Sequence, residues 1–304
     1  LGKKIMKKKK SFKSGFAAII GMPNVGKSTL LNTIVGQKIA IISDKPQTTR
    51  NKILAIYSTD EEQIIFTDTP GIHKPHNKLG EYMVHVANES MDDTDVLIFV
   101  VDASKKIQET EREIAKNISK TGLPCILVLN KVDLMKKEDL LPIIADYSSM
   151  HDFASIVPVS AKNNDGVDIL LHDIEDYLEE GPEFYDSDMV TDQPEKQIAA
   201  EIIREKLLWL LDKEVPHGIA IEITKMQEKE KITNIYATIY CEKASHKGII
   251  IGKHGEMLKK IGTMARGDIE KMLDKKVYLE LWVKVKSDWR NSDFLIKNFG
   301  FTNE

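Results

Sequence analysis

The sequence predicts an α/β fold in two parts: a larger domain with a mostly parallel sheet, followed by a smaller α+β domain. Three observations support this prediction. The 304 residues suffice for about two domains of roughly 100–200 residues each. Through the first half, short apolar runs alternate with helical patterns, which is the arrangement of βαβ units in a parallel sheet. In the second half, two long strands with alternating apolar and polar residues lie between helical stretches.

The first domain is predicted to span residues 14–181 and to contain six strands separated mainly by helices. Each expected strand is a short apolar run bounded by polar or turn-forming residues. The strands are expected over Phe16–Ile20, Ile53–Tyr57, Gln63–Thr67, Val96–Val101, Cys125–Leu129 and Ile156–Val159, and two of the helices over Glu109–Lys120 and Lys136–Ser149. Ligands bind at the carboxyl ends of the strands in such sheets, so motifs at those ends are the first candidates for a site.

A linker over residues 182–196 separates the two predicted domains. Residues 173–192 contain nine acids and no base, together with Gly181 and Pro182, which indicates a solvated helix end that runs into a connection. The second domain is expected over 197–290 and a tail over 291–304. Its expected elements are a helix at Gln197–Leu211, strands at about His217–Gln227 and Lys231–Cys241, a helical region interrupted by Gly252 and Gly255, and a strand at Val277–Val285.

Composition excludes several classes of protein. With 42% hydrophobic and 30% charged residues, the chain is neither a membrane protein nor a disordered tail. No apolar run reaches the roughly 18–20 residues that a membrane-spanning helix needs. The two cysteines, Cys125 and Cys241, lie inside apolar strand-like runs, which excludes a disulfide framework or a cysteine zinc site and fits a reducing cytosol.

Charge is unevenly distributed along the chain, whose net charge is −4. Residues 243–286 contain 11 basic and 5 acidic residues. This excess indicates either a polyanion-binding face or a solvated helix surface, and charge alone favours neither. The start, Leu1–Lys13, holds seven lysines and no acid. Because it lacks an apolar core segment it is not a secretory signal, and we interpret it as a flexible start with incidental affinity for polyanions.

A phosphate-binding loop is the strongest motif of the first domain. After the first expected strand the chain reads GMPNVGKS, which has the GxxxxGK[ST] spacing in its required strand–loop–helix context. Glycines allow backbone N–H groups to turn toward phosphate oxygens, and the N-terminus of the following helix favours the same anion. A chance glycine turn is the alternative, and the context argues against it. The predicted phosphate-binding residues are Gly21, Met22, Pro23, Asn24, Val25, Gly26, Lys27, Ser28 and Thr29.

A second motif favours guanine over adenine. NKVD follows the buried strand at 125–129, and an SA pair ends the next strand. The carboxylate of Asp133 can accept hydrogen bonds from N1–H and the 2-amino group of guanine, which adenine lacks. Lys131 can cover a face of the base, Asn130 can tie this loop to the phosphate loop, and the Ala161 N–H can reach guanine O6. NKxD alone also fits a charged helix start. The predicted base-binding residues are Asn130, Lys131, Val132, Asp133, Ser160 and Ala161.

Two further segments suit a magnesium ion and the γ-phosphate. DTPG, which is Asp68, Thr69, Pro70 and Gly71, lies at the end of the third expected strand. There Asp68 would hold Mg²⁺ through a water, and the Gly71 N–H would meet the γ-phosphate. Ser28 offers a hydroxyl to the same ion. A threonine of the segment Gln47–Arg50 would complete the shell, and we choose Thr49, with Thr48 as the alternative and plain solvation as the default for such a pair.

Together these signatures resemble the translation-factor-like GTPases, over Phe16 to about Glu180. The resemblance implies hydrolysis of GTP to GDP, with Mg²⁺ as the cofactor. It also implies that the residues at the reaction are Lys27, Thr49, Gly71 and Asn24.

The residue after the DTPG glycine departs from many relatives. They place a glutamine there to orient the attacking water, whereas this chain has Ile72, like the hydrophobic-substituted members. Asn24 matches the asparagine that coordinates K⁺ beside the phosphates in potassium-activated members. Loop capping is the equally weighted alternative for Asn24.

The second domain contains a candidate nucleic-acid clamp. An apolar run, Ile249–Ile251, is followed by the GxxG turn GKHG between two expected helices. In the order strand–strand–helix–GxxG–helix–strand, with basic residues around it, this turn is similar to that of a type II KH domain, which clamps about four nucleotides of a single strand. A tight helix–helix turn is the alternative. The predicted RNA contacts are Gly252, Lys253, His254, Gly255, Lys259, Lys260, Arg266 and Arg290.

A GTPase domain joined to this KH domain resembles the Era family of bacterial GTPases over nearly the whole chain. The resemblance rests on Gln47–Arg50, Asp68–His73, Gly248–Gly255 and the ending LWVKVK with Trp289 and Arg290. It implies a switch that binds small-subunit (16S) ribosomal RNA near its 3′ end and acts in small-subunit assembly. It also implies a cytoplasmic protein with some peripheral association at the inner face of the membrane. We further expect a monomer.

Two other functions are compatible with the motifs. A tRNA-modifying GTPase shares the Thr-Thr-Arg switch and Asn24, but that class embeds its GTPase in a helical domain and has a C-terminal cysteine motif, whereas this chain ends FTNE. A passive RNA-binding module is disfavoured because every nucleotide motif is intact. A nucleotide switch joined to an RNA clamp also predicts coupling between the two, with the acidic linker or the segment Gln47–Arg50 lying against the basic face in the GDP state.

Overall fold

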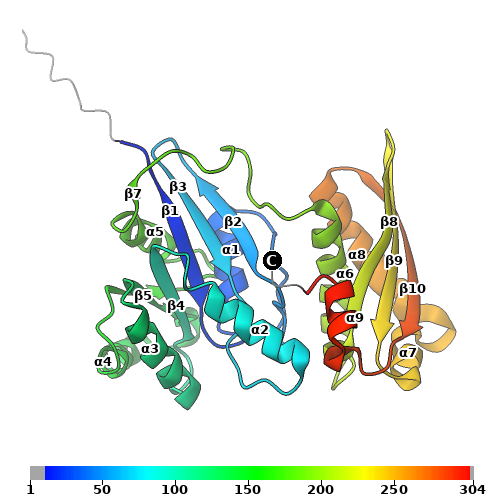
Figure 1. Ribbon diagram of the computed structural model, residues 1–304, viewed down its shortest axis with the longest axis horizontal. Helices are drawn as coiled ribbons and strands as arrows, with labels where there is room; N and C mark the ends of the chain where they lie inside the picture. Colours follow the sequence, from blue (N-terminus) through cyan, green and yellow to red (C-terminus); the bar gives the residue numbers. More distant parts are fainter. Residues whose placement is uncertain (1–10, 302–304) are drawn as a thin grey trace, which may run out of the picture.

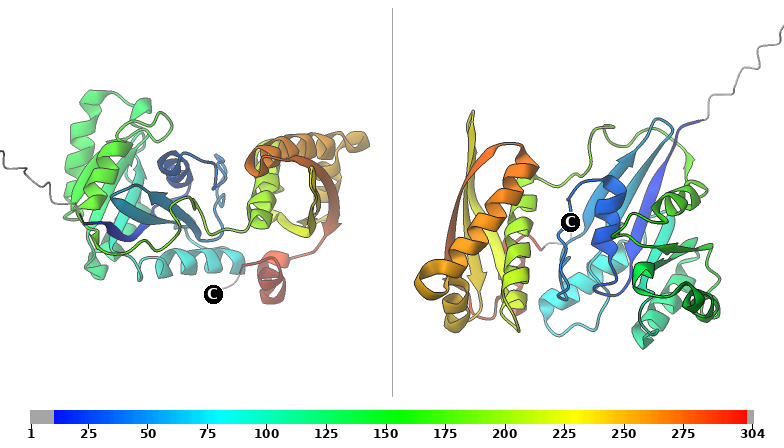
Figure 2. Two further views of the ribbon diagram at one scale, coloured as in Figure 1. Left: turned by 90° about the horizontal axis from the view of Figure 1, so that it is seen from above. Right: turned by 180° about the vertical axis from the view of Figure 1, so that it is seen from behind.

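The computed structural model describes residues 11–301 and shows two domains side by side (Figure 1). Residues 1–10 of the predicted flexible start and residues 302–304 of the predicted tail lie outside the described residues. The segment between β7 and α6, residues 181–194, leads from the first domain to the second (Figure 2). Within the described part of the chain, no helix is both long and apolar enough to cross a bilayer.

The first domain confirms the predicted, mostly parallel sheet. Its strand order is β2-β3-β1-β4-β5-β6, with β2 antiparallel to β3 and the other neighbours parallel, while the short β7 pairs with β1. All six predicted strands are present, and the helix expected at 136–149 begins with a 3₁₀ turn. The elements are β1 (Lys13–Ile20), α1 (Lys27–Val35), β2 (Ile53–Ser58), β3 (Glu62–Asp68), α2 (Lys78–Glu89), β4 (Val96–Asp102), α3 (Glu109–Thr121), β5 (Cys125–Asn130), α4 (Leu140–Ser148), β6 (Ser155–Val159), α5 (Val167–Glu175) and β7 (Glu179–Glu180).

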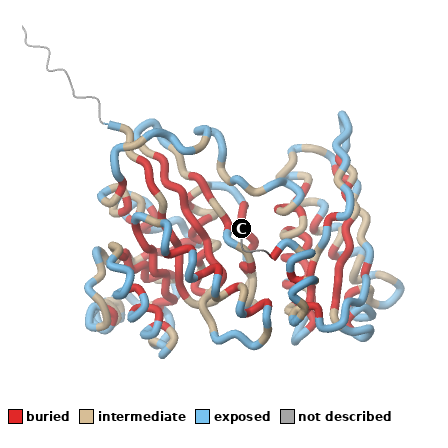
Figure 3. The backbone as a smooth tube through the Cα atoms, in the orientation of Figure 1, coloured by how far each residue is buried: buried red, intermediate tan, exposed pale blue. Residues whose placement is uncertain are grey.

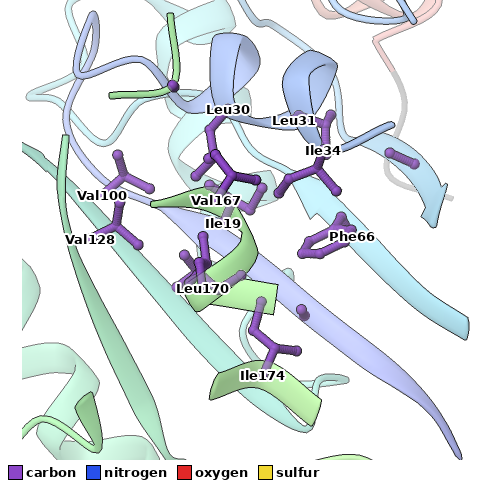
Figure 4. Packing of buried hydrophobic residues seen from close by; sticks show 14 of the residues in the cluster. Ile19, Leu30, Leu31, Ile34, Phe66, Val100, Val128, Val167, Leu170 and Ile174 are labelled. Atoms are coloured by element: carbon purple, nitrogen blue, oxygen red, sulfur yellow. The ribbon is translucent and has the colours of Figure 1, made fainter. Parts of the chain in front are cut away.

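Two hydrophobic layers hold this sheet between helices. On one face, α1 and α5 bring Leu30 and Leu170 against side chains such as Ile19 and Phe66 (Figure 4). On the other face, α3 and α4 cover a second cluster that includes Ile118. The central strands are buried on both sides (Figure 3), which explains why they are continuous apolar runs in the sequence. Polar motifs are therefore left to the loops at the strand ends.

The second domain confirms the predicted order of elements. They are α6 (Glu195–Leu210), β8 (Ala220–Glu228), β9 (Ile232–Cys241), α7 (Ala244–Ile251), α8 (Glu256–Leu273) and β10 (Lys276–Val285). The central strand β9 is antiparallel to β8 and parallel to β10. Helices α6 and α8 pack on one face of the sheet around Ile203, Ile235 and Ile261. On the opposite face, Tyr240 packs against Phe299.

The predicted linker is attached to the first domain over much of its length. The buried Gln63 side chain on β3 accepts the N–H groups of Phe184 and Tyr185 and donates to the Tyr185 carbonyl. Further along, the Ile56 N–H donates to the Val190 carbonyl at 3.0 Å. The acidic segment therefore lies along β2 and β3 in this structure.

The described part of the predicted tail, residues 291–301, is folded back between the domains. Helix α9 (Asp293–Asn298) follows Trp289, and the Phe301 ring lies 5.9 Å from the Tyr82 ring of α2. Trp289 and Phe301 join Leu79 of α2 in one buried cluster. This small hydrophobic core crosses the domain boundary.

Candidate nucleotide site and nucleic-acid interface

The phosphate loop follows β1 and leads into α1. Gly21 and Gly26 adopt φ angles of +148° and +102°. A Cβ at Gly26 would lie 2.2 Å from Nδ2 of Asn130, and one at Gly21 would lie 2.3 Å from the Val100 carbonyl oxygen. Only glycine therefore fits at these two positions. Because α1 begins at Lys27, its unpaired N-terminal N–H groups face the loop.

One cavity collects most of the predicted phosphate-binding residues. It is lined by Pro23, Asn24, Gly26, Lys27, Ser28, Thr29, Thr49 and Gly71, together with residues 41–43 and Gln47 and Thr48. Met22 and Val25 contribute through their carbonyl groups, which accept hydrogen bonds from Lys27 and Asn130. Residues 41–43 carry no motif, so the sequence did not point to them.

The Lys27 ammonium lies at the centre of the phosphate loop. Its Nζ donates to the carbonyls of Gly21 at 3.2 Å and Met22 at 3.0 Å, and the residue is only 6% exposed. Burial lowers the pKa of Lys27 to about 8, against the opposing attraction of Asp68. A buried cation whose hydrogen bonds go to neutral carbonyls gains strongly from an anion placed beside it.

Ser28, Thr49 and Asp68 come from three segments and meet in one cluster. Ser28 Oγ donates to Asp68 Oδ2 at 2.6 Å and lies 2.9 Å from Thr49 Oγ1. Thr49 Oγ1 lies 3.4 Å from the same carboxylate oxygen. The Thr48 hydroxyl instead donates to the Lys45 carbonyl at 2.6 Å. Thr49 therefore belongs to this cluster, whereas the Thr48 hydroxyl is bonded elsewhere.

This cluster has the chemistry of a magnesium site. All of its side-chain ligands are hard oxygen donors. Asp68 is fully buried, burial raises the pKa of Asp68 against the pull of Lys27, and Asp68 Oδ1 has no hydrogen-bond partner. A buried carboxylate oxygen without a hydrogen-bond partner, such as Asp68 Oδ1, is suited to binding a cation directly or through water. Among residues 11–301, no group of three or more His, Cys, Asp or Glu forms an alternative metal centre.

The segment after β3 packs against the phosphate loop. The Ile72 N–H donates to the Gly21 carbonyl at 3.1 Å. A Cβ at Gly71 would lie 2.6 Å from the backbone nitrogen of Pro23, so the two loops approach as closely as glycine allows. The Thr69 hydroxyl donates to the carbonyl of Ile19 in β1 at 2.9 Å. The side chain of this predicted nucleotide-binding residue is therefore engaged in a hydrogen bond to the neighbouring strand.

Asn130 links three parts of the predicted base pocket. Its Nδ2 donates to the Val25 carbonyl at 2.8 Å, which is the predicted tie to the phosphate loop. Its Oδ1 accepts the Ala161 N–H at 3.1 Å, so this N–H, expected to reach guanine O6, already has a partner here. The Ser160 hydroxyl donates to Asp133 Oδ1 at 2.6 Å and orients that carboxylate.

Lys131 has a carboxylate partner that the sequence analysis missed. Its Nζ donates to the Asn24 carbonyl and to Asp102 Oδ2, both at 2.7 Å. Burial alone would raise the pKa of Asp102, but hydrogen bonds from Lys131 and Ser104 outweigh burial and lower that pKa. One signal could have indicated Asp102: it lies at the carboxyl end of β4, and the neighbours of β4 in the sheet, β1 and β5, are both followed by nucleotide motifs. Val132 begins the 3₁₀ turn that presents Asp133.

Asn24 connects the phosphate loop to the segment that precedes Thr49. It has a left-handed φ of +64°, and its Nδ2 donates to the Asp44 carbonyl at 2.6 Å. Asparagine tolerates this backbone conformation better than most residues. Its side-chain oxygen is the atom that would be available to a cation.

Residues 47–50, named here the switch segment, are held by the second domain. Arg204 on α6 donates to the carbonyls of Gln47 and Thr48. Arg50 is buried and donates to the Ile219 carbonyl at 2.6 Å and the His217 carbonyl at 2.9 Å. Thr49 therefore reaches the phosphate loop while its neighbours reach the other domain. Figure 2 shows α6 on the side of the second domain that faces the first.

A buried ionic network continues from this contact into α8. Glu205 accepts from Lys38 of the first domain at 2.6 Å and from Lys206 at 2.7 Å. Lys38 and Lys206 also contact Asp268 on α8. Glu205 and Lys206 are adjacent on α6, but their other partners, Lys38 and Asp268, lie far away in the sequence, so no local pattern marked this network.

The GxxG turn opens onto a groove between α8 and β10. The groove has a volume of about 550 Å³. It is lined by Gly255, Leu258, Lys259, Gly262, Thr263, Arg266, Leu279, Glu280 and Leu281. Lys253, His254 and Lys260 are exposed beside it. The contribution of β10 to the groove was missed because it depends on the packing of β10 beside α8, which no local spacing in the sequence indicates.

Two predicted RNA residues have structural partners. At Gly252, which has φ +73°, a Cβ would lie 2.7 Å from Cβ of Met257, so the turn itself requires glycine. Arg290 forms a two-point ion pair with Glu242, with N–O distances of 3.1 and 2.6 Å, and is not among the groove-lining residues. The structure therefore does not bring Arg290 to the predicted RNA contacts.

Two family models match the chain, one in each domain. Residues 16–131 match the model described as a 50S ribosome-binding GTPase. Residues 214–290 match the model of the KH domain. These matches agree with the assembled phosphate loop and with the GxxG groove.

Full-length relatives and solved structures have the same two domains. GTPase Era of Ruminiclostridium cellulolyticum is 58% identical over 96% of this chain and 98% of that protein. GTPase Era of Clostridioides difficile is 53% identical over 96% of this chain and 100% of that protein. A crystal structure of an Aquifex aeolicus Era variant bound to GDP·AlF4⁻ is 41% identical with a TM-score of 0.93, and covers 96% of this chain and 100% of that one. An Era complex with MgGDPNP and nucleotides 1506–1542 of 16S ribosomal RNA matches equally well.

Proposed function

Because the chain belongs to the Era family of GTPases, we propose that it is a GTP-driven switch that binds small-subunit ribosomal RNA through its KH domain and acts in assembly of the small ribosomal subunit. Its catalytic activity is that of a GTPase. Membership of this family disfavours both alternative functions, tRNA modification and passive RNA binding. The proposal extends to the residues that hold the nucleotide, the metal and the RNA.

GTP would bind along the carboxyl ends of β1, β3, β5 and β6. Lys27 and the N–H groups of the phosphate loop would hold the phosphates. Asp133, oriented by Ser160, would accept the two guanine donors, and the Lys131 stem would lie over the base. A bound base would cover the exposed Asp133 carboxylate, and adenine would leave it without its two donors, which would disfavour ATP.

Hydrolysis would depend on electrostatic stabilisation by groups already in place. When bound, Mg²⁺ neutralises charge on the β- and γ-phosphate oxygens, and Ser28, Thr49 and Asp68 would hold it. The Lys27 ammonium and the Gly71 N–H would face the charge that builds up on the γ-phosphate. Ile72 has no polar side-chain atom with which to orient water, so this task falls to backbone groups, to a partner or to K⁺ beside Asn24.

RNA would bind in the groove between α8 and β10. The GxxG turn lets a phosphodiester backbone approach, and Lys253, Lys259 and Arg266 supply charge along one side. The proposed ligand is the 3′ end of small-subunit ribosomal RNA, because a structural relative carries nucleotides 1506–1542 of 16S ribosomal RNA. Phosphate contacts of this kind give strongly salt-dependent affinity.

The observation that carries the proposal is the double attachment of the switch segment. Thr49 lies 2.9 Å from Ser28 in the nucleotide site, while Arg50 and the Thr48 carbonyl are bound to the KH domain. A change at the γ-phosphate would therefore act on α6, and through Asp268 on α8, which lines the groove.

The test measures both activities in one protein. RNA from the small-subunit 3′ end is titrated against the GDP form and a non-hydrolysable GTP form at fixed salt. We expect affinities that differ by about 5- to 150-fold, and the same factor in GTP affinity with and without RNA. Gly252→Asp should abolish RNA binding and leave GTP affinity in the absence of RNA unchanged. Absence of RNA binding by the wild-type protein would refute the RNA part, and equal affinities would refute the coupling.

We further propose a monomer in the cytoplasm with peripheral membrane contact. Both cysteines, Cys125 and Cys241, are buried and free, which suits a reducing compartment. The membrane contact rests on family resemblance. Sedimentation of the purified protein, alone and with anionic vesicles, tests the oligomeric state and the membrane contact separately.

A further inference from the structure

Exposed aromatic residues follow the edge strand β10 on the face of the sheet that α6 and α8 do not cover. Tyr278 and Trp282 are 46% and 61% exposed. Tyr236 on β9 lies beside them, with its ring centre 6.1 Å from that of Tyr278. Alternate residues of β10, such as Val283, are buried against the helices. We name Tyr236, Tyr278 and Trp282 the aromatic platform.

The rings of the aromatic platform are held in position. Trp282 Nε1 donates to Glu280 Oε1 at 2.8 Å, and the Tyr278 hydroxyl donates to Glu280 Oε2 at 2.9 Å. The Lys225 ammonium lies 5.9 Å from the centre of the Tyr236 ring. With their polar ends bonded to Glu280, the rings of Tyr278 and Trp282 keep their orientation and lose little freedom when a flat group stacks on them.

The aromatic platform adjoins the RNA groove. Leu279 and Leu281 of the same strand line the groove, so β10 has the groove along its edge and the platform on its outer face. The exposed Lys276 and Lys284 flank the platform on β10, and Lys276 has a loose ion pair with Glu270 at 3.8 Å. Figure 1 shows β10 on the side of the molecule away from the GTPase domain. A strand that leaves the groove over β10 therefore meets both aromatic rings and positive charge.

We propose that the aromatic platform stacks bases of the same RNA strand that occupies the groove. This inference rests on the proposed RNA-binding function and extends it beyond the roughly four nucleotides that a GxxG turn clamps. Aromatic side chains stack on any base, and nearby lysines neutralise the phosphates. The platform thus adds affinity for a longer single strand without adding sequence preference.

The test compares two single-stranded RNAs from the small-subunit 3′ end, one of about four nucleotides and one of about twelve. In the full-length protein, Trp282→Ala should weaken binding of the longer RNA about 5- to 100-fold, the effect of losing a stacked base, and leave the shorter RNA unaffected. Trp282→Phe should retain most of the affinity. Phe294→Ala on α9, which removes an aromatic residue that is 72% exposed outside the platform, is the matched control and should change neither affinity.

The outcomes separate the aromatic platform from the proposed function. Unchanged affinity of Trp282→Ala for the longer RNA, or an equal loss for both lengths, would overturn the platform. If the wild-type protein binds the longer RNA and Gly252→Asp does not, binding in the groove stands whatever Trp282 does. If the wild-type protein binds neither RNA, the RNA-binding function itself fails. GTP affinity and the unfolding midpoint should be the same in Trp282→Ala and wild type, because Trp282 lies on the surface.

Discussion

Lys38 and Glu205 form an ion pair across the domain boundary, with Nζ and Oε2 2.6 Å apart. Glu205 is fully buried, and its other oxygen accepts the Ile42 N–H at 3.0 Å. The chain that leads into the switch segment is therefore anchored on α6 before Thr49 is reached. Glu205 keeps Lys206 as a second partner at 2.7 Å, so losing Lys38 would not leave its charge unpaired, but the Lys38 contact still opposes separation of the domains here. Movement of the switch on hydrolysis should consequently be transmitted to α6.

Arg204→Ala should uncouple nucleotide state from RNA binding. The substitution removes the hydrogen bonds to the Gln47 and Thr48 carbonyls while leaving the nucleotide pocket and the groove intact. The ratio of RNA affinities between the GTP-analogue and GDP forms should fall toward one, as measured by fluorescence anisotropy. Lys196→Ala, an exposed change on the same helix, is the control. An undiminished ratio in Arg204→Ala would contradict the route through α6.

Asp133→Asn should bind GTP more weakly and xanthosine triphosphate more tightly than the wild-type protein. The amide can pair with the altered base edge, whereas the carboxylate matches the two guanine donors. Ser160→Ala should have a smaller effect, about 0.5–1.5 kcal/mol, because it removes the hydroxyl that orients the carboxylate. Calorimetric titration with GTP, ATP and xanthosine triphosphate measures all three. Equal binding of ATP and GTP by the wild-type protein would show that the base pocket is wrongly assigned.

Thr49→Ala and Thr48→Ala should differ sharply in their need for Mg²⁺. Thr49 lies beside Ser28 and Asp68, so its loss should raise the Mg²⁺ concentration for half-maximal hydrolysis by about tenfold or more. The Thr48 hydroxyl bonds only within its own turn, to the Lys45 carbonyl, and its loss should have little effect. Hydrolysis rates across a Mg²⁺ titration give the comparison. Similar curves for the two variants would argue against Thr49 as a ligand.

GTP binding should weaken as pH rises through about 8, the pKa to which burial lowers Lys27 in the free protein. The charged form of Lys27 binds phosphate, and the phosphate in turn raises the pKa of Lys27 in the complex. Binding is therefore fully supported below this pH, and above it binding takes up a proton. Titration calorimetry in two buffers of different ionisation enthalpy counts the protons. Proton release on GTP binding, in place of uptake, would contradict this prediction. In Lys27→Ala the proton uptake should be absent.

Exchange of K⁺ for Na⁺ at constant ionic strength should slow hydrolysis if Asn24 holds the cation. Its Nδ2 donates to the Asp44 carbonyl, which leaves its oxygen for the ion. Asn24→Ala should then hydrolyse GTP equally slowly in both salts. Ile72→Ala should change the rate far less than Lys27→Ala, because Ile72 offers no polar group to the transition state. Equal wild-type rates in the two salts would favour loop capping as the role of Asn24.

Three predicted parts of the nucleotide site share one property: each is a short motif at the end of a strand. Gly21–Ser28, Asp68–Gly71 and Asn130–Asp133 follow buried apolar runs, and a parallel sheet brings the ends of its strands together. The sequence therefore predicts that side chains of these three motifs meet at one edge of the sheet. Asp102 also ends a strand but belongs to no motif, and it was missed.

The sequence by itself determined the positions of the strands, the succession of helices and strands along the second domain, and the nucleotide motifs. Hydrophobic period, motif spacing and turn residues are local properties of the chain. Only the tertiary structure decided that Arg204 holds the switch segment, that β10 completes the groove and that Arg290 is paired with Glu242. These contacts join segments far apart in sequence, and many pairings of exposed charges or strand edges would satisfy the same local pattern. Which of them forms depends on how two separately formed cores dock, and that is set by the shape of the buried surfaces between them.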